Sequence, residues 1–174
     1  MDIWENVRGC HGNSEASSDC EPPGVLSLHG KPPGVRRSSE IIVGWRVWGI
    51  STLDPTSARP AAAKALILVS TFMDSVWQPG KAMTACCGAN TLRHGIHAFV
   101  TPAEAMLYMA EGRKPVRHVF GEVSLWGRVV IHQHGYRAQC AYPRRIFVPK
   151  IYRRSRDIVN ELRRSYGVET EWTT

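Results

Sequence analysis

The sequence has no long hydrophobic run and none of the common catalytic signatures. No apolar stretch reaches the roughly 18 residues that a membrane span needs, and the N-terminus lacks the basic and then apolar layout of a signal peptide. These absences predict a cytoplasmic protein without a membrane partner. Serine-nucleophile, Walker, dinucleotide-binding and HExxH zinc motifs are also missing, which excludes the commonest enzyme classes.

Cysteine is scarce as well. The five cysteines are odd in number and unevenly spaced, which does not predict the disulfide framework of a secreted domain. An alternative is a metal site that combines Cys86 or Cys87 with His94 and His97. No fourth ligand is evident, and residues three apart on a strand face opposite sides, so we expect no metal and no cofactor.

The composition divides the chain into a tail and a folded part. Residues 1–40 are rich in glycine, proline and serine and show little apolar periodicity, so they predict a flexible leader that is dispensable for folding. The β-branched and aromatic segment 41–50 is typical of a strand. We therefore expect residues 41–174 to form a single α+β domain with a curved, mainly antiparallel sheet and two helices.

A hairpin over residues 119–148 is the strongest local prediction. Odd positions from 119 to 131 are apolar or glycine and even positions are mixed, which indicates a strand with one face on a core. Gly135 would supply a positive φ for the turn at Gln133–His134. Matching apolar residues across this turn predicts the pairs Ile131–Tyr136, Val129–Ala138, Arg128–Gln139, Gly127–Cys140 and Leu125–Tyr142.

Capping signals place the two helices. Thr101, Pro102 and Glu104 form a capping-box pattern at the start of the first helix, directly after a short strand at 95–100. Ser155 would cap the second helix, which Gly167 would end. Its buried face would carry Ile158, Val159, Leu162 and Tyr166. Further segments predict strands at 65–71 and 168–172 and a turn at 77–80.

Positive charge is concentrated in the C-terminal part. Residues 111–174 hold 13 Lys/Arg and 6 Asp/Glu, so they account for the whole net charge of +7. Cations bind phosphate backbones, and exposed aromatic rings between them stack bases; here the rings would be Tyr142, Tyr152 or Trp126. We therefore predict a non-enzymatic accessory module that contacts nucleic acid or a nucleoprotein partner. The residues expected to bind are Arg144, Arg145, Lys150, Arg153, Arg154, Arg156 and Arg163.

The even face of the hairpin offers a second candidate site. Its acid, aromatic and guanidinium groups would share one side of the sheet: Glu122, Trp126, Arg128, Arg137 and Gln139. As a cleft, this face would stack a planar ligand on Trp126 and hold an anion with the arginines. As an ordinary solvated face, it would carry only a cross-strand ion pair.

Several of these segments resemble a group of small uncharacterised bacterial proteins. The shared features are a W-x-P-G turn at Trp77, a G-I-H-A-F segment at Gly95 and a G-E-V-x-L-W-G-x-V-x-x-H-x-x-G-Y-R-A hairpin that begins at Gly121. The similarity spans about residues 44–148. Arg93 and His94 stand where the group has cysteines, and Gln139 stands where it has glutamate. The group has no established activity, so the resemblance implies no reaction.

The order of elements is also similar to that of ADP-ribosyltransferases. An early strand with Arg46 is followed by G-I-H-A-F, a capped helix and a late hairpin. Those enzymes place a glutamate on a late strand to orient the ribose of NAD, whereas Gln139 here lacks the charge. The similarity implies an alternative function as a nucleotide-binding cleft enzyme, or an inactive relative of one, with Arg46, Glu122 and Gln139 as candidate residues.

Overall fold

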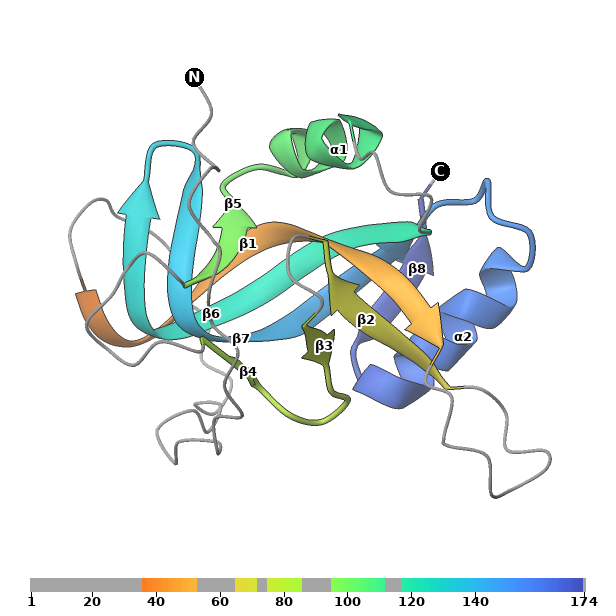
Figure 1. The fold of residues 1–174 in the computed structure, drawn as a ribbon, viewed down its shortest axis with the longest axis horizontal. Helices are drawn as coiled ribbons and strands as arrows, with labels where there is room; N and C mark the ends of the chain where they lie inside the picture. The colour runs from red at the N-terminus through yellow and green to blue at the C-terminus, as the bar shows by residue number, and fades with distance from the viewer. Residues whose placement is uncertain (1–35, 53–64, 72–74, 86–94, 112–116, 174) are drawn as a thin grey trace.

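The computed structural model describes residues 36–52, 65–71, 75–85, 95–111 and 117–173. Within these ranges the chain forms an eight-stranded, strongly twisted sheet and two helices (Figure 1). The elements are β1 (Arg36–Thr52), β2 (Leu66–Ser70), β3 (Val76–Trp77), β4 (Met83–Thr84), β5 (Ile96–Phe99), α1 (Pro102–Glu111), β6 (His118–His132), β7 (Gly135–Val148), α2 (Ser155–Tyr166) and β8 (Glu169–Trp172). The predicted single α+β domain with a mainly antiparallel sheet is confirmed.

The β6–β7 hairpin follows the predicted register only near its turn. The pairs Ile131–Tyr136 and Val129–Ala138 are confirmed. A β-bulge then places Gly127, at φ 74°, and Arg128 together opposite Gln139. The Oε1 atom of Gln139 accepts a hydrogen bond from the Arg128 amide at 3.3 Å. The predicted Gly127–Cys140 and Leu125–Tyr142 pairs are therefore wrong, and the structure instead pairs Trp126 with Cys140 and Leu125 with Ala141.

Gly135 serves a purpose other than the predicted one. The glycines with positive φ in the described residues are Gly80, Gly127 and Gly167, so the hairpin turn does not use Gly135 in that way. Gly135 instead pairs with Phe99 of β5, where an added Cβ would lie 2.5 Å from the carbonyl oxygen of Ala98. The absence of a side chain lets β5 approach β7 closely.

The sheet is strongly curved, and β1, β6, β7 and β5 pair in a closed cycle. β1 pairs with β6, β6 with β7 and β7 with β5, and β5 returns to β1 at Trp45 and Phe99. β8 adds a parallel strand on β7. β1 begins at Arg36, which pairs with Val129, so the last five residues of the predicted leader 1–40 belong to the sheet. The remainder of that leader lies outside the described residues.

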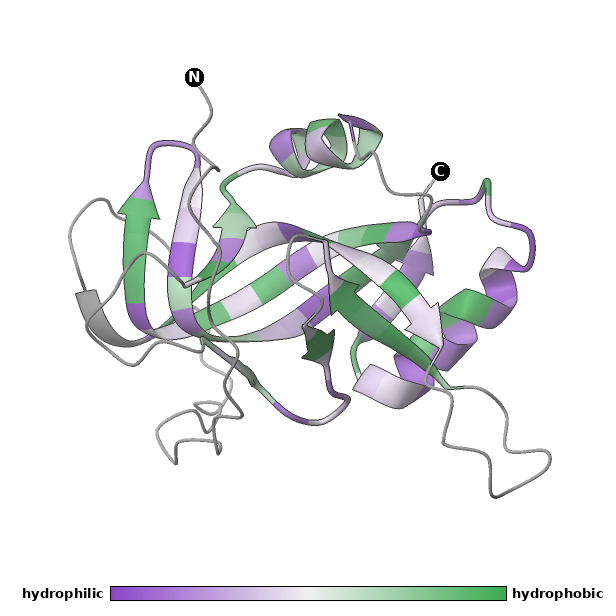
Figure 2. Ribbon diagram, in the orientation of Figure 1, coloured by the Kyte–Doolittle hydropathy of each residue, from purple (hydrophilic) through white to green (hydrophobic). Residues whose placement is uncertain are grey.

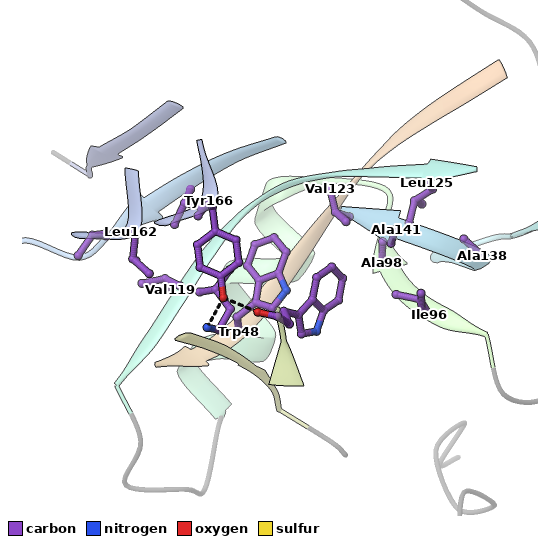
Figure 3. Close-up of a cluster of buried hydrophobic side chains, with 14 of the residues drawn as sticks. Trp48, Ile96, Ala98, Val119, Val123, Leu125, Ala138, Ala141, Leu162 and Tyr166 are labelled. Atoms are coloured by element: carbon purple, nitrogen blue, oxygen red, sulfur yellow. Dashed lines mark hydrogen bonds between the residues drawn. The ribbon is translucent and has the colours of Figure 1, made fainter. Parts of the chain in front are cut away.

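Helix α2 covers one face of the sheet and completes the larger core. The four residues predicted to be buried, Ile158, Val159, Leu162 and Tyr166, are buried. The Tyr166 hydroxyl donates to the carbonyl oxygen of Trp77 at 2.5 Å and accepts from the Leu68 amide at 2.7 Å (Figure 3). The predicted Ser155 cap is wrong: Arg154 is the N-cap, in the left-handed region and without a side-chain capping bond. Gly167 ends the helix as predicted.

Helix α1 covers the opposite face with a smaller core of Val47, Ala105 and Phe120. The predicted capping box is present, because Thr101 and Glu104 exchange hydrogen bonds between side chain and backbone at 3.1 and 3.3 Å. Ala105 is the fully buried residue of α1, whereas Leu107 is 63% exposed, so the helix covers the sheet incompletely. Neither helix in the described residues is long and apolar enough to cross a membrane.

Candidate functional site

A cavity of about 520 Å³ lies beside helix α1 on its side of the sheet. The residues that line it belong to the middle of β1, to β5, to α1 and to the tip of the β6–β7 hairpin. This volume lies within the range of about 300–1,000 Å³ that is typical of small-molecule sites. The polar groups that converge on the cavity are Arg46, His97, Glu104, Glu111, His132, His134 and Arg137.

Arg46 is the most deeply enclosed charge in this cavity. Its guanidinium donates to the carbonyl oxygen of His97 and, at 3.2 Å, to the hydroxyl of Ser70. The Nε atom is buried and has no hydrogen-bond partner. Burial lowers the pKa of Arg46 to about 10, so the group stays positive at neutral pH. The ion pairs within the described residues do not include Arg46.

Arg137 extends the positive wall, and His97, which is neutral at neutral pH, lies opposite it. The two residues pair across β5 and β7, and both line the cavity. Burial, together with the positive charges of Arg137 and Arg46, lowers the pKa of His97 to about 4. Burial and Arg137 also lower the pKa of His132. Because this wall disfavours added positive charge, its electrostatic potential favours an anion.

Aromatic rings lie close to these charges. Phe99, Tyr108 and Tyr136 line the cavity and are half-buried. The rings of Phe99 and Tyr108 are tilted against each other with their centroids 5.5 Å apart. The Tyr108 hydroxyl donates to Thr71 at 3.2 Å, which ties α1 to the residue that follows β2. A planar ligand group would therefore find ring surface next to the arginines.

Helix α1 supplies the acidic side of the cavity through Glu104 and Glu111. Glu104 lies 3.3 Å from Nδ1 of His134, in the hairpin turn, so this contact joins the helix to the hairpin. Burial alone would raise the pKa of Glu104, but hydrogen bonds from Thr101 and His134 outweigh it and the net pKa is lowered. The cavity is thus polarised, with cations on the sheet and carboxylates on the helix.

Only part of the predicted cleft face lines the cavity. Arg137 lines the cavity, whereas Glu122, Trp126 and Arg128 do not. Trp126 is 4% exposed and packs on Cys140, so its ring is not available to stack a ligand. Of the transferase candidates, Arg46 lines the cavity, but Glu122 lies 3.5 Å from Arg144 and Gln139 fills the bulge at Gly127.

Metal binding finds no geometric support in the described residues. They contain no group of three or more His, Cys, Asp or Glu side chains that could hold an ion. Of the predicted ligands, His97 lines the cavity, while Cys86, Cys87 and His94 lie outside the described residues. Cys140 is fully buried and disulfide-bonded, a bond that the sequence did not lead us to expect.

The predicted basic surface separates into two sets of cations. Arg145 bonds to Glu169 at 2.5 and 2.8 Å, Arg144 lies 3.5 Å from Glu122, and Arg163 donates to the carbonyl oxygen of Thr170. The second set is exposed and takes part in none of the ion pairs found in the described residues: Lys150, Arg153, Arg154 and Arg156. These four lie in or next to the connection between β7 and α2, a hydrophilic end of the molecule (Figure 2).

Sequence reasoning missed most of the cavity. His132 and His134 are exposed and border the cavity, and no place at a cavity was predicted for them or for Glu104, Tyr108 and Tyr136. One signal was present: Arg46 interrupts the otherwise apolar segment 41–50, and a charge in such a position needs a reason. Comparisons with family models, curated proteins and solved structures found no match to this chain.

Proposed function

We propose that the cavity binds a small anionic ligand that carries a planar ring, and that a nucleotide is the chemical class that fits it best. The observation that carries this proposal is Arg46, a half-buried and charged side chain at the cavity whose Nε atom is fully buried and has no hydrogen-bond partner. A buried charge without an opposite charge is costly, and a ligand phosphate would provide the missing partner.

Each part of a nucleotide has a matching wall. Arg46 and Arg137 are suited to the phosphate because guanidinium groups bind phosphate oxygens with two parallel hydrogen bonds. Phe99 and Tyr136 offer ring surface for the base. The carboxylate of Glu111 can accept hydrogen bonds from sugar hydroxyls.

The proposal is one of binding and assigns no bond-making step. The transferase reading of the sequence depends on Glu122 and Gln139, and neither residue lines the cavity. A binding role agrees with the expectation of a non-enzymatic accessory module, with a nucleotide as ligand of the cavity.

The test is isothermal titration calorimetry with AMP, adenosine and inorganic phosphate. We expect AMP to bind at least tenfold more tightly than adenosine, since charge-assisted hydrogen bonds contribute about 1.5–3 kcal/mol. Arg46→Met and Arg137→Met should each weaken AMP binding by tenfold or more and change adenosine binding little. Arg164→Met is the control, because Arg164 is exposed and bonds to Glu161 outside the cavity.

Three outcomes would contradict the proposal. The first is an Arg46→Met protein that melts cooperatively and binds AMP as tightly as the natural protein. The second is adenosine binding equal to that of AMP, which would show that no cation of the cavity contacts the phosphate. Failure of all three probes to bind at millimolar concentration would reject the nucleotide class.

A further inference from the structure

The connection between β7 and α2 presents a second charged surface, and none of its residues lines the cavity. Lys150, Arg153, Arg154 and Arg156 fall within seven residues, and each is exposed. Two other arginines, one on β7 and one on α2, are neutralised: Arg145 by Glu169 and Arg164 by Glu161. The adjacent carboxylate, Asp157 in the first turn of α2, forms none of the ion pairs found in the described residues. Four like charges so close together form a surface that an external anion would stabilise.

This segment, residues 150–156, is held firmly in place. The hydroxyl of Tyr152 donates to the His118 carbonyl oxygen and accepts from the His118 amide, both at 2.8 Å. Two turns follow each other, from the Tyr152 amide to Pro149 at 3.2 Å and from the Ser155 amide to Tyr152 at 3.0 Å. Cations on a pinned segment lose less conformational entropy on binding than cations on a flexible tail.

The chemistry of the segment favours phosphate over other anions. Three of its four cations are arginines, whose planar guanidinium groups bind phosphate in a bidentate manner. Ile151, 87% exposed, is the one large apolar side chain at this tip, and a single such side chain anchors a protein weakly to a lipid surface. A polymer with regularly repeated phosphates matches several cations at once.

The aromatic residues expected to stack bases are engaged elsewhere. Trp126 is buried, and the Tyr142 hydroxyl is shared between the Gly80 amide and the Tyr166 carbonyl oxygen. The Tyr152 hydroxyl holds His118, and its ring packs against the core. We infer that residues 150–156 bind the phosphate backbone of a nucleic acid without reading its bases, independently of the ligand in the cavity.

The salt dependence of binding gives a quantitative expectation. Each phosphate contact to a duplex contributes about 0.9 to the slope of log K against log salt, so four contacts predict a slope of about −3.6. Affinity should therefore fall by about 100-fold between about 50 and 200 mM NaCl. Two unrelated sequences should bind with equal affinity, because no base is contacted.

The experiment is fluorescence anisotropy with two labelled duplexes of unrelated sequence across this salt series. The test variant is Arg153→Gln with Arg156→Gln. The control is Arg145→Gln with Arg164→Gln, which has the same net charge but removes cations that are already paired with glutamates. We expect the affinity of the test variant for the duplexes to fall tenfold or more at low salt, and its slope of log K against log salt to become less steep by about 2. Both changes should be much smaller in the control.

Several results would overturn the inference. Equal losses in the two variants would show that only net charge matters. No binding at about 50 mM NaCl, or binding that salt does not weaken, would exclude a phosphate contact. Binding to vesicles with an anionic lipid, lost in Ile151→Ser and absent for both duplexes, would assign the surface to membranes instead. Melting curves must show that each variant is folded.

Discussion

The guanidinium carbon of Arg46 lies 5.0 Å from the ring centroid of Trp77, and both side chains donate a hydrogen bond to the hydroxyl of Ser70. Trp77 precedes the turn at Pro79–Gly80, so the W-x-P-G pattern supplies a ring for the cation, and Ser70 at the end of β2 supplies the acceptor. The position of the Arg46 guanidinium is therefore set in part by residues that do not line the cavity.

This arrangement predicts an effect of Ser70→Ala on both stability and binding. The substitution leaves the buried Nε1 of Trp77 without its acceptor, which should lower the free energy of unfolding by about 1–3 kcal/mol. It also frees Arg46 to rotate, so AMP affinity should fall several-fold. Urea unfolding and calorimetry measure the two effects. Ser124→Ala, on the half-exposed part of β6, should change stability by less than about 0.5 kcal/mol.

His97 predicts a dependence of stability on pH. Its pKa is about 4 in the folded protein, below the ordinary 6.5, so the unfolded chain binds more protons between these values. The contribution of His97 to the free energy of unfolding is therefore fully present above about pH 6.5 and is lost as the pH falls through 4. The loss is at most about 3 kcal/mol.

Urea unfolding at pH 7 and pH 4 measures this loss. His97→Asn should show a smaller decrease between the two pH values than the natural protein. Gln133→Asn is the control, because Gln133 lies in the same exposed hairpin turn and does not titrate. An identical pH dependence in the natural protein and in His97→Asn would contradict the prediction.

Gly80 and Gly127 have the same left-handed backbone conformation, but we expect alanine to destabilise the protein to different extents at the two positions. Gly80 and Gly127 have φ of 71° and 74°, so both substitutions carry the left-handed backbone penalty of about 1 kcal/mol. An added Cβ at Gly80 meets nothing within 4 Å, whereas at Gly127 it lies 3.0–3.4 Å from Gln139. Gly127→Ala should therefore be clearly more destabilising than Gly80→Ala in urea unfolding. Equal losses would show that the bulge adapts freely.

We expect the substitution of Arg154 by glycine to stabilise the protein. It is the non-glycine residue with positive φ in the described chain, at 66°, and glycine adopts this conformation without steric cost. Arg154→Gly should raise the free energy of unfolding by about 1 kcal/mol and should also weaken duplex binding. Arg153→Gly is the control: it removes the same charge where φ is not positive, so it should bring no gain. A stability loss in Arg154→Gly would contradict this account.

Much of the local structure follows from the sequence. Alternation of apolar residues predicts β6, β7 and the face of α2, because side-chain direction along a strand or helix depends only on local geometry. The capping box at Thr101 and the stop at Gly167 are equally local, since each satisfies backbone groups within a few residues. The bulge at Gly127 was not predicted, because the apolar alternation of residues 119–131 runs through it without interruption.

The candidate sites depend on contacts between distant parts of the chain. Arg46 meets His97, 51 residues away, only because the curved sheet brings β5 back to β1. Likewise, Glu169 neutralises Arg145 because β8 returns alongside β7, whereas none of the strands in the described residues pairs next to Arg153. The composition therefore determined that this chain is basic, and the order of its apolar, capping and turn residues determined that it folds as an α+β domain. Which cations are buried, paired or free was decided by the tertiary structure, since electrostatic pairing depends on distance in space and not on separation along the chain.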